Sequence, residues 1–308
     1  MLKIFLILLL ITSILESKVV DYKITPSNLK SQSHMNIKIK ILDAKELKFP
    51  KKNGIEFSEI SDLAYKDFRL FALSDRGFLY RLSVDLSHGK IDNLTLVNSM
   101  SLKDKKRSAS DKEYKDSEGM AFFENDLLIS FEKKHRVDLY DLNAKKIDSV
   151  KINKSLENLS KYVSANKGLE SVAYNEKYGV ITAPEVPLIN KNSKFHTIYS
   201  KDKTWSFKAD GSISGLEFIN KNEVLALLRQ ESFLALRRVT TLVVVNLNDC
   251  KNGKCKSEVV ANMDSSDGWR LDNFEGLTKV GKNRFLIISD DNGSFFQKTL
   301  LVLFEIVK

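Results

Sequence analysis

The sequence is short of the residues that separate domains and of those that build metal clusters. Its 308 residues include only four Pro, thirteen Gly and two Cys. No linker rich in Pro, Gly or Ser interrupts the chain, so we expect a single domain over 18–308. There is no zinc-finger spacing and no basic helix, which argues against nucleic-acid binding despite a net charge of +9. That charge instead favours encounter with a small anionic substrate or ligand.

The motifs of several common enzyme classes are also missing. No G-x-S-x-G sequence occurs, which excludes the usual nucleophile of an α/β-hydrolase. No glycine-rich loop is placed to cradle phosphates. The four histidines show no metal-ligand spacing and are best interpreted as ordinary surface residues: His34, His88, His135 and His196. The sequence therefore gives little support to these chemistries.

A long apolar run occurs only at the start of the chain. Met1-Leu-Lys3 precedes the apolar segment Ile4–Leu15, which has the charged start and short core of a secretory signal. The run is too short to span a bilayer comfortably. We predict a signal peptide over 1–17, cleaved after Ser17 or alternatively Ser13, with an uncleaved anchor as the other reading. The protein is then periplasmic or secreted, with no membrane span after cleavage.

The two cysteines agree with export. Cys250 and Cys255 flank Asn252-Gly253, a dipeptide typical of tight hairpin turns. Cysteines in such flanking positions come within disulfide range, and an oxidising compartment preserves the bond. A two-thiol metal clip is the alternative, but it lacks partner ligands. We predict a disulfide that staples this turn.

One pattern is repeated five times along the chain: a polar residue, an apolar strand, a turn, a return strand and a second polar residue. The copies begin at Ser61, Glu118, Glu170, Ser214 and Glu275, 44 to 61 residues apart. Within each copy the two polar positions lie 14 or 15 residues apart. A period of this length is typical of propeller blades. We therefore predict an all-β fold, a β-propeller of four-stranded antiparallel blades.

The two ends of the chain are predicted to close the ring. After the fifth copy only one strand remains, Thr299–Val307, so that blade lacks a member. The apolar alternation of His34–Leu42 supplies it, and pairing of the two ends would leave only short sheet edges. Five blades are visible, and a sixth within 21–60 or 186–213 stays open. One short helix is expected at Ser155–Val163, capped by Ser155.

The polar residues of the repeat should gather at one end of the ring. In an antiparallel hairpin, a residue before the first strand and one after the return strand lie at the same end. The acidic members are Asp75, Glu118, Glu132, Glu170, Glu185, Glu275 and Asp290, with Arg76 and Arg229 beside them. So many carboxylates repel one another unless protons or cations intervene, and hard oxygen ligands suit Ca²⁺. We predict that the acids bind Ca²⁺ and that Arg76 and Arg229 bind an anionic substrate.

A purely structural role is the alternative for part of this set. Acids at strand ends can tie neighbouring blades by accepting hydrogen bonds from backbone amides. Glu118, Glu170 and Glu275 recur beside Gly or Ser, as such ties would. The second positions vary more between copies and are better candidates for ligand contact.

Several of these motifs together resemble the phytase-like family, often called "esterase-like activity of phytase". They are Ser74-Asp-Arg-Gly77, Glu118-Gly-Met120, Gly168-Leu-Glu170-Ser171, Glu275-Gly-Leu277 and Ser289-Asp-Asp291. The resemblance covers about residues 54–306 and departs from the Glu-Gly pattern at Ser61-Asp62 and Ser214-Gly215, while Arg229 replaces an acid. It implies an exported bacterial propeller that hydrolyses phosphate esters or esters.

Two functions follow from this reading. The first is an exported, metal-assisted hydrolase of phosphate esters that acts as a monomer. The alternative is a non-catalytic propeller of the cell envelope that binds a ligand or a protein, since a fold does not determine a function.

Overall fold

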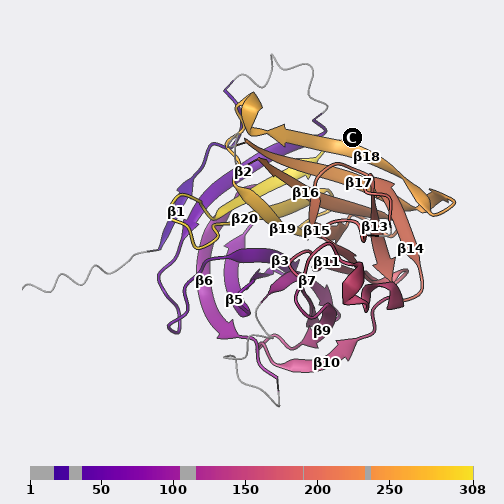
Figure 1. Ribbon diagram of the computed structural model, residues 1–308. Helices are drawn as coiled ribbons and strands as arrows, with labels where there is room; N and C mark the ends of the chain where they lie inside the picture. The colour runs from indigo at the N-terminus through magenta and orange to yellow at the C-terminus, as the bar shows by residue number, and fades with distance from the viewer. Residues whose placement is uncertain (1–16, 28–36, 105–115, 190, 233–236, 308) are drawn as a thin grey trace, which may run out of the picture.

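The computed structural model describes residues 17–27, 37–104, 116–189, 191–232 and 237–307. Apart from Ser17, the predicted signal peptide lies outside the described residues. Within them, no helix has both the length and the apolar character needed to cross a bilayer. The described residues form strands almost throughout, arranged around a common axis (Figure 1).

The strands form consecutive antiparallel groups of four, as the repeat predicted. The first blade contains β3 (Ile60–Lys66), β4 (Arg69–Ser74), β5 (Phe78–Asp85) and β6 (Asp92–Ser101), and the second contains β7 (Ser117–Phe123), β8 (Asp126–Phe131), β9 (Arg136–Tyr140) and β10 (Lys146–Val150). The third blade contains β11 (Leu169–Asn175), β12 (Gly179–Pro184), β13 (Phe195–Ser200) and β14 (Thr204–Lys208). The fourth contains β15 (Ser212–Phe218), β16 (Glu223–Ser232), β17 (Arg237–Lys251) and β18 (Lys254–Asp264). A single parallel bridge, Ser206 to Lys254, joins the third and fourth groups.

The fifth blade closes the ring with strands from both ends of the chain. Its order is β19 (Asn273–Lys279), β20 (Arg284–Asp290), β21 (Leu300–Ile306), β2 (Ile39–Lys48) and an added outer strand, β1 (Lys18–Asp21). The predicted closure is thus confirmed, with a closing strand that runs from Ile39 to Lys48, while residues 34–36 of the predicted strand His34–Leu42 lie outside the described residues. The two segments in which a sixth blade had stayed open, 21–60 and 186–213, contribute strands mainly to the fifth and third blades instead. The topology is compatible with five blades.

Two smaller predictions have different outcomes. Cys250 and Cys255 form the predicted disulfide across the β17–β18 turn. The predicted helix at Ser155–Val163 is wrong, because the chain forms two 3₁₀ turns there, η3 (Lys154–Leu156) and η4 (Leu159–Lys161). Asn153, in place of Ser155, caps the first turn, which ends at Glu157, and Asn158, in an extended conformation, caps the second. Side chains of this type compete with helix continuation.

The innermost strands are buried on both faces, because each blade packs against two neighbours. β3 and β11 show five consecutive buried residues where a half-exposed strand would alternate. Apolar clusters fill the space between neighbouring blades, with Phe274, Leu277 and Phe285 in one of them. The inner strands of successive blades contact one another around the ring, β19 against β3 included.

Each innermost hairpin carries a break in register at the same place. The pairing shifts between Ile60 and Asp62, Ser117 and Met120, Leu169 and Ser171, Ile213 and Gly215, and Phe274 and Gly276. The residues that have no partner in this pairing are the first polar positions of the repeat, such as Glu170 and Glu275. We expected them to precede the strand, whereas they lie inside it at a β-bulge. A bulge bends the strand and redirects a side chain, and in three of the blades the redirected side chain is an acid: Glu118, Glu170 or Glu275.

The glycine of the repeated Glu-Gly pair is needed because the blades approach closely there. A Cβ atom on Gly119 would lie 2.6 Å from the Cα of Ser171 in the next blade. A Cβ atom on Gly276 would lie 2.8 Å from the Cα of Asp62. Both distances are too short for real atoms, and backbone cannot move aside as a flexible side chain can. The motif is thus partly a packing requirement of the ring.

We predict that Gly119→Ala destabilises the protein by about 1–3 kcal/mol, the usual cost of overpacking. Gly281→Ala is the matched control, since its Cβ would meet nothing closer than 3.4 Å. Urea denaturation of both variants measures the difference. Equal stability of the two variants would contradict the close approach of β7 and β11.

Candidate functional site

All seven acidic residues of the repeat line one pocket of about 180 Å³. The first set, Glu118, Glu170 and Glu275, comes from the bulges of β7, β11 and β19. The second set comes from the ends of the return strands: Asp75 after β4, Glu132 after β8, Glu185 after β12 and Asp290 at the end of β20. The remaining lining residues are Arg229, Asn166, Lys167 and Asn292. The geometry inferred from the hairpin spacing is therefore present.

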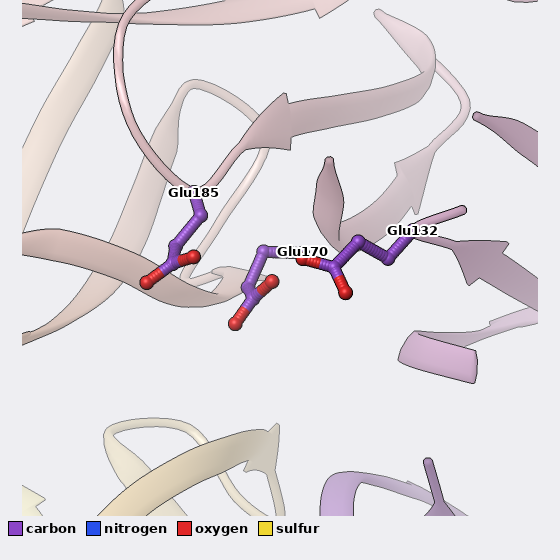
Figure 2. A group of neighbouring side chains, drawn as sticks. All are labelled: Glu132, Glu170 and Glu185. Carbon is purple, nitrogen blue, oxygen red and sulfur yellow. The ribbon is translucent and has the colours of Figure 1, made fainter. Parts of the chain in front are cut away.

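Three of the acids could hold a metal ion together. Glu132, Glu170 and Glu185 each offer an oxygen, and these three oxygens all lie within 4.8 Å of one another. Figure 2 shows Glu170 between the other two, with the carboxylates turned toward the same space. The side chains are nearly inaccessible, with residue exposures of 9%, 5% and 3%. Carboxylate oxygens at this spacing suit a hard cation.

The pocket holds its acids at unusual pKa values. Loss of water contact raises the pKa of Asp75 and of Glu132 to about 7, with neighbouring carboxylates adding to the effect. Burial, and then repulsion from Glu275, raise the pKa of Asp290 to about 9. Burial also raises the pKa of Glu118 and Glu170 well above the ordinary value. In each case burial away from water and repulsion between neighbouring carboxylates disfavour the charged form of the acid. A bound cation would relieve this repulsion.

Arg229 is the internal counter-ion of this pocket. Its Nη1 lies 2.8 Å from Glu275 Oε1, and its Nη2 lies 3.3 Å from Glu170 and 3.6 Å from Glu185. Its Nη1 also donates to Asn273 Oδ1 at 2.8 Å. Arg229 occupies the second polar position of the fourth repeat, so a cation stands there in place of an acid and contacts three of the seven carboxylates.

Three residues that line the pocket were not predicted from the sequence: Asn166, Lys167 and Asn292. Lys167 places its Nζ 2.7 Å from Glu185 and is 40% exposed at the side chain. It directly precedes Gly168-Leu-Glu170, and Asn292 follows Asp290 by two residues, so both flank motifs that had been recognised. Lys and Asn beside a motif are too common to carry a signal alone.

Arg76, predicted beside the acids, is not among the residues that line the pocket. Its Nη1 lies 3.0 Å from Glu59 Oε2, and its guanidinium stacks on the ring of Phe78 at 5.6 Å. The hairpin spacing predicts at which end of the ring a residue lies. It does not determine where the side chain of Arg76, one residue after the marked Asp75, points.

Two acids outside the polar positions of the repeat, Asp62 and Glu217, accept hydrogen bonds from neighbouring blades, as the marked acid Glu132 does from the amide of Gly168 at 3.4 Å. Asp62 Oδ2 accepts a hydrogen bond from the amide of Met120 in the second blade at 2.6 Å. Its Oδ1 accepts from Leu277 in the fifth blade at 2.9 Å and from Leu63 at 2.8 Å. Glu217 in β15 similarly accepts from the amide of Lys279 in β19 at 3.1 Å. Asp62, the residue after the first bulge, and Glu217, three residues beyond the bulged Ser214, therefore tie the ring, whereas the bulged acids line the pocket.

The chain matches a family of known proteins. The sequence pattern of the family described as "Phytase-like: Esterase-like activity of phytase" matches residues 55–293. The chain belongs to this family. Among curated proteins, no sequence matches it.

The solved structures that are similar to this phytase-like chain are distant. The glutaminyl cyclase of Myxococcus xanthus matches with a TM-score of 0.46 at 11% identity, over 88% of this chain and 97% of its own. The Dos1 propeller matches with a TM-score of 0.38 at 11% identity, over 86% and 74%. The mitotic checkpoint complex matches with a TM-score of 0.38 at 9% identity, over 86% and 69%. Values this low carry no information on activity.

The raised pKa values predict how the stability of the metal-free protein depends on pH. Above about pH 4.5 the unfolded chain has released carboxylate protons that the folded pocket still binds, so stability falls as pH rises. Between pH 7 and 9 the groups responsible include Asp290, with a pKa of about 9, and Asp75 and Glu132, with pKa values of about 7. Melting temperatures in EDTA should therefore fall from pH 7 to pH 9.

The control for this prediction is Asp290→Asn, which cannot ionise. Its melting temperature should fall less steeply over the same range. A metal-free protein that is equally stable at pH 7 and pH 9 would contradict the crowding of ionised acids in the pocket.

Proposed function

We propose that this protein is an exported hydrolase of phosphate esters whose acidic pocket holds a Ca²⁺ ion. The observation that carries the proposal is the trio Glu132, Glu170 and Glu185, whose oxygens lie within 4.8 Å of one another inside a pocket lined by seven acids. Membership of the phytase-like family supports the same class of reaction.

The donor set favours calcium among the common cations. All nearby ligands are carboxylate oxygens or amide oxygens, such as those of Asn166 and Asn292, and none is a thiol. Ca²⁺ accepts six to eight such ligands in flexible geometry, whereas zinc prefers nitrogen and sulfur. Glu132, Glu170 and Glu185 would hold the ion. When bound, it would supply Lewis-acid polarisation of a phosphoryl oxygen and relieve the repulsion among the acids.

The remaining residues of the pocket have roles that their positions support. Lys167, at the rim, would bind a phosphate oxygen, because its side chain is partly exposed and pairs with a single acid. Arg229, held by Glu170 and Glu275, would orient these carboxylates and contact phosphate through the remaining guanidinium surface. Asp75, outside the trio and with a pKa raised to about 7 by burial, would accept the proton of the attacking water.

The setting of the reaction is part of the proposal. The disulfide in the β17–β18 turn supports export to the periplasm or the medium. There the protein would act as a monomer on a small anionic substrate.

We predict that Ca²⁺ stabilises the protein. At a hundredfold excess over its Kd, an ion that binds only the folded state adds about 2.7 kcal/mol to the free energy of unfolding. Glu170→Gln should weaken Ca²⁺ binding by roughly 10–100-fold, comparing Kd values from titration calorimetry. The matched control is Glu176→Gln, at the opposite end of the same β11–β12 hairpin and exposed, which should bind Ca²⁺ as the wild type does.

We also predict that the wild type hydrolyses a model phosphomonoester or phosphodiester in the presence of Ca²⁺, and that EDTA abolishes the activity. Asp75→Asn should lower kcat while Ca²⁺ binding persists, since Asp75 lies outside the trio. Tight Ca²⁺ binding without activity on a panel of phosphate and carboxylate esters would favour the alternative function, a binding propeller of the cell envelope.

A further inference from the structure

A second cavity lies on the outer side of the third blade, away from the acidic pocket, and shares no lining residue with it. Its volume is about 310 Å³. One wall is a face of the β13–β14 hairpin, and the other is the tip of the β17–β18 hairpin, Asn252, Gly253 and Lys254. Figure 1 shows this long hairpin extending along the outer side of the propeller near β14.

The lining of this cavity is opposite in character to that of the acidic pocket. Among the described residues that line it, none is Asp or Glu. Two lysines, Lys191 and Lys254, supply positive charge, and Asn192 and Asn252 supply side-chain amides. Ammonium groups without a carboxylate in the same cavity attract an anion, and amides can donate to or accept from hydroxyl groups.

Three hydroxyl side chains on one face of the β13–β14 hairpin line the cavity: Thr197, Thr204 and Ser206. Thr197 of β13 pairs in register with Ser206 of β14, so their side chains share one face, and their hydroxyls lie 3.0 Å apart. Thr204 lies two residues before Ser206 and also lines the cavity. At the edge, Lys254 Nζ lies 4.8 Å from the centre of the Phe195 ring, which holds the ammonium against this face.

The disulfide gives the second wall a fixed position. Cys250 and Cys255 are cross-strand partners on either side of the tip, and the bond between them closes the turn that carries Asn252 and Lys254. The tip is also docked on the third blade, because the amide of Ser206 donates to the carbonyl of Gly253 at 2.8 Å. The disulfide adds a covalent link to this attachment and to the packing of Cys255 in the same apolar cluster as Trp205 and Phe207.

From this arrangement we propose that the cavity binds a small phosphorylated polyol, of which a sugar phosphate is the simplest example. Lys191 and Lys254 bind its phosphate, and the hydroxyls and amides bind its hydroxyl groups. The cavity is a non-catalytic site, separate from the acidic pocket, and the proposal does not depend on hydrolysis there. The role of the disulfide is then to hold one wall of a binding site.

The test is titration calorimetry of the purified protein in EDTA, which removes any cation from the acidic pocket. Glucose 6-phosphate is the probe, with glucose and inorganic phosphate as comparisons. Glucose 6-phosphate should bind more tightly than either, since only it engages both the lysines and the hydroxyl face. If phosphate binds as tightly as glucose 6-phosphate, the site is a simple anion site and the polyol assignment is overturned.

Variants locate the binding. Lys254→Gln should weaken binding of glucose 6-phosphate roughly tenfold, the effect of losing one charge-assisted hydrogen bond. Lys251→Gln, its partner across the turn and outside the cavity lining, makes the same change of charge and should leave the Kd unchanged. Equal effects of the two would show a non-specific attraction and overturn the proposal. Melting temperatures confirm that each variant is folded.

Two further measurements separate the proposal from its alternatives. A Cys250→Ser/Cys255→Ser double variant should bind glucose 6-phosphate more weakly while its Kd for Ca²⁺ is unchanged. Unchanged binding of the sugar phosphate would contradict the role of the disulfide. Glu170→Gln should leave binding of glucose 6-phosphate unchanged. Tighter binding by that variant would place the ligand in the acidic pocket instead and overturn the second site.

Discussion

The structure depends on the close approach of five inner hairpins around one axis. At this crowded centre a side chain has no room between neighbouring blades, which is why Gly119 and Gly276 face the backbone of Ser171 and Asp62. The inner strands meet the constraint with a bulge at the same position in each hairpin. In three of the five hairpins the bulged side chain lines the pocket, as Glu118, Glu170 and Glu275 do.

This arrangement separates two roles that acidic residues play in the ring. Asp62 and Glu217 are satisfied by backbone amides of neighbouring blades and hold the ring together. Glu118, Glu170 and Glu275 come from the bulges and line the pocket. Arg229 reduces the repulsion by contacting Glu170, Glu185 and Glu275, but one guanidinium does not neutralise seven carboxylates. A pocket in this state favours protons at low pH and a cation at higher pH.

The sequence predicted the structure correctly where a repeated spacing is compatible with only one local geometry. The distance of 14 or 15 residues between paired polar positions fixed the hairpin, and the hairpin brought Asp75, Glu132, Glu185 and Asp290 to the same end. The missing strand of the last blade correctly indicated closure by the N-terminal segment, although β2 begins later than its apolar alternation suggested. The turn Asn252-Gly253 between two cysteines was enough to predict the disulfide.

What the sequence could not show depends on contacts between distant residues. Asp62 looked like a departure from the Glu-Gly motif, because only the folded ring brings the amides of Met120 and Leu277 to it. Arg76 looked like a pocket residue until Glu59 and Phe78 set its direction. The helix expected near Ser155 failed because its apolar spacing does not reveal that Leu159 and Val163 are exposed, at 58% and 61%. Lys167 had no periodic signal at all.

The central claim is that the converging acids form a cation site and are not merely buried charges. An anomalous difference map from crystals grown with Ca²⁺ tests it most directly. We predict a peak bound by oxygens of Glu132, Glu170 and Glu185 at about 2.3–2.6 Å, the range for calcium. A map with no peak in the pocket at saturating Ca²⁺, or one in which Lys167 or Arg229 fills the space between these three carboxylates, would contradict it.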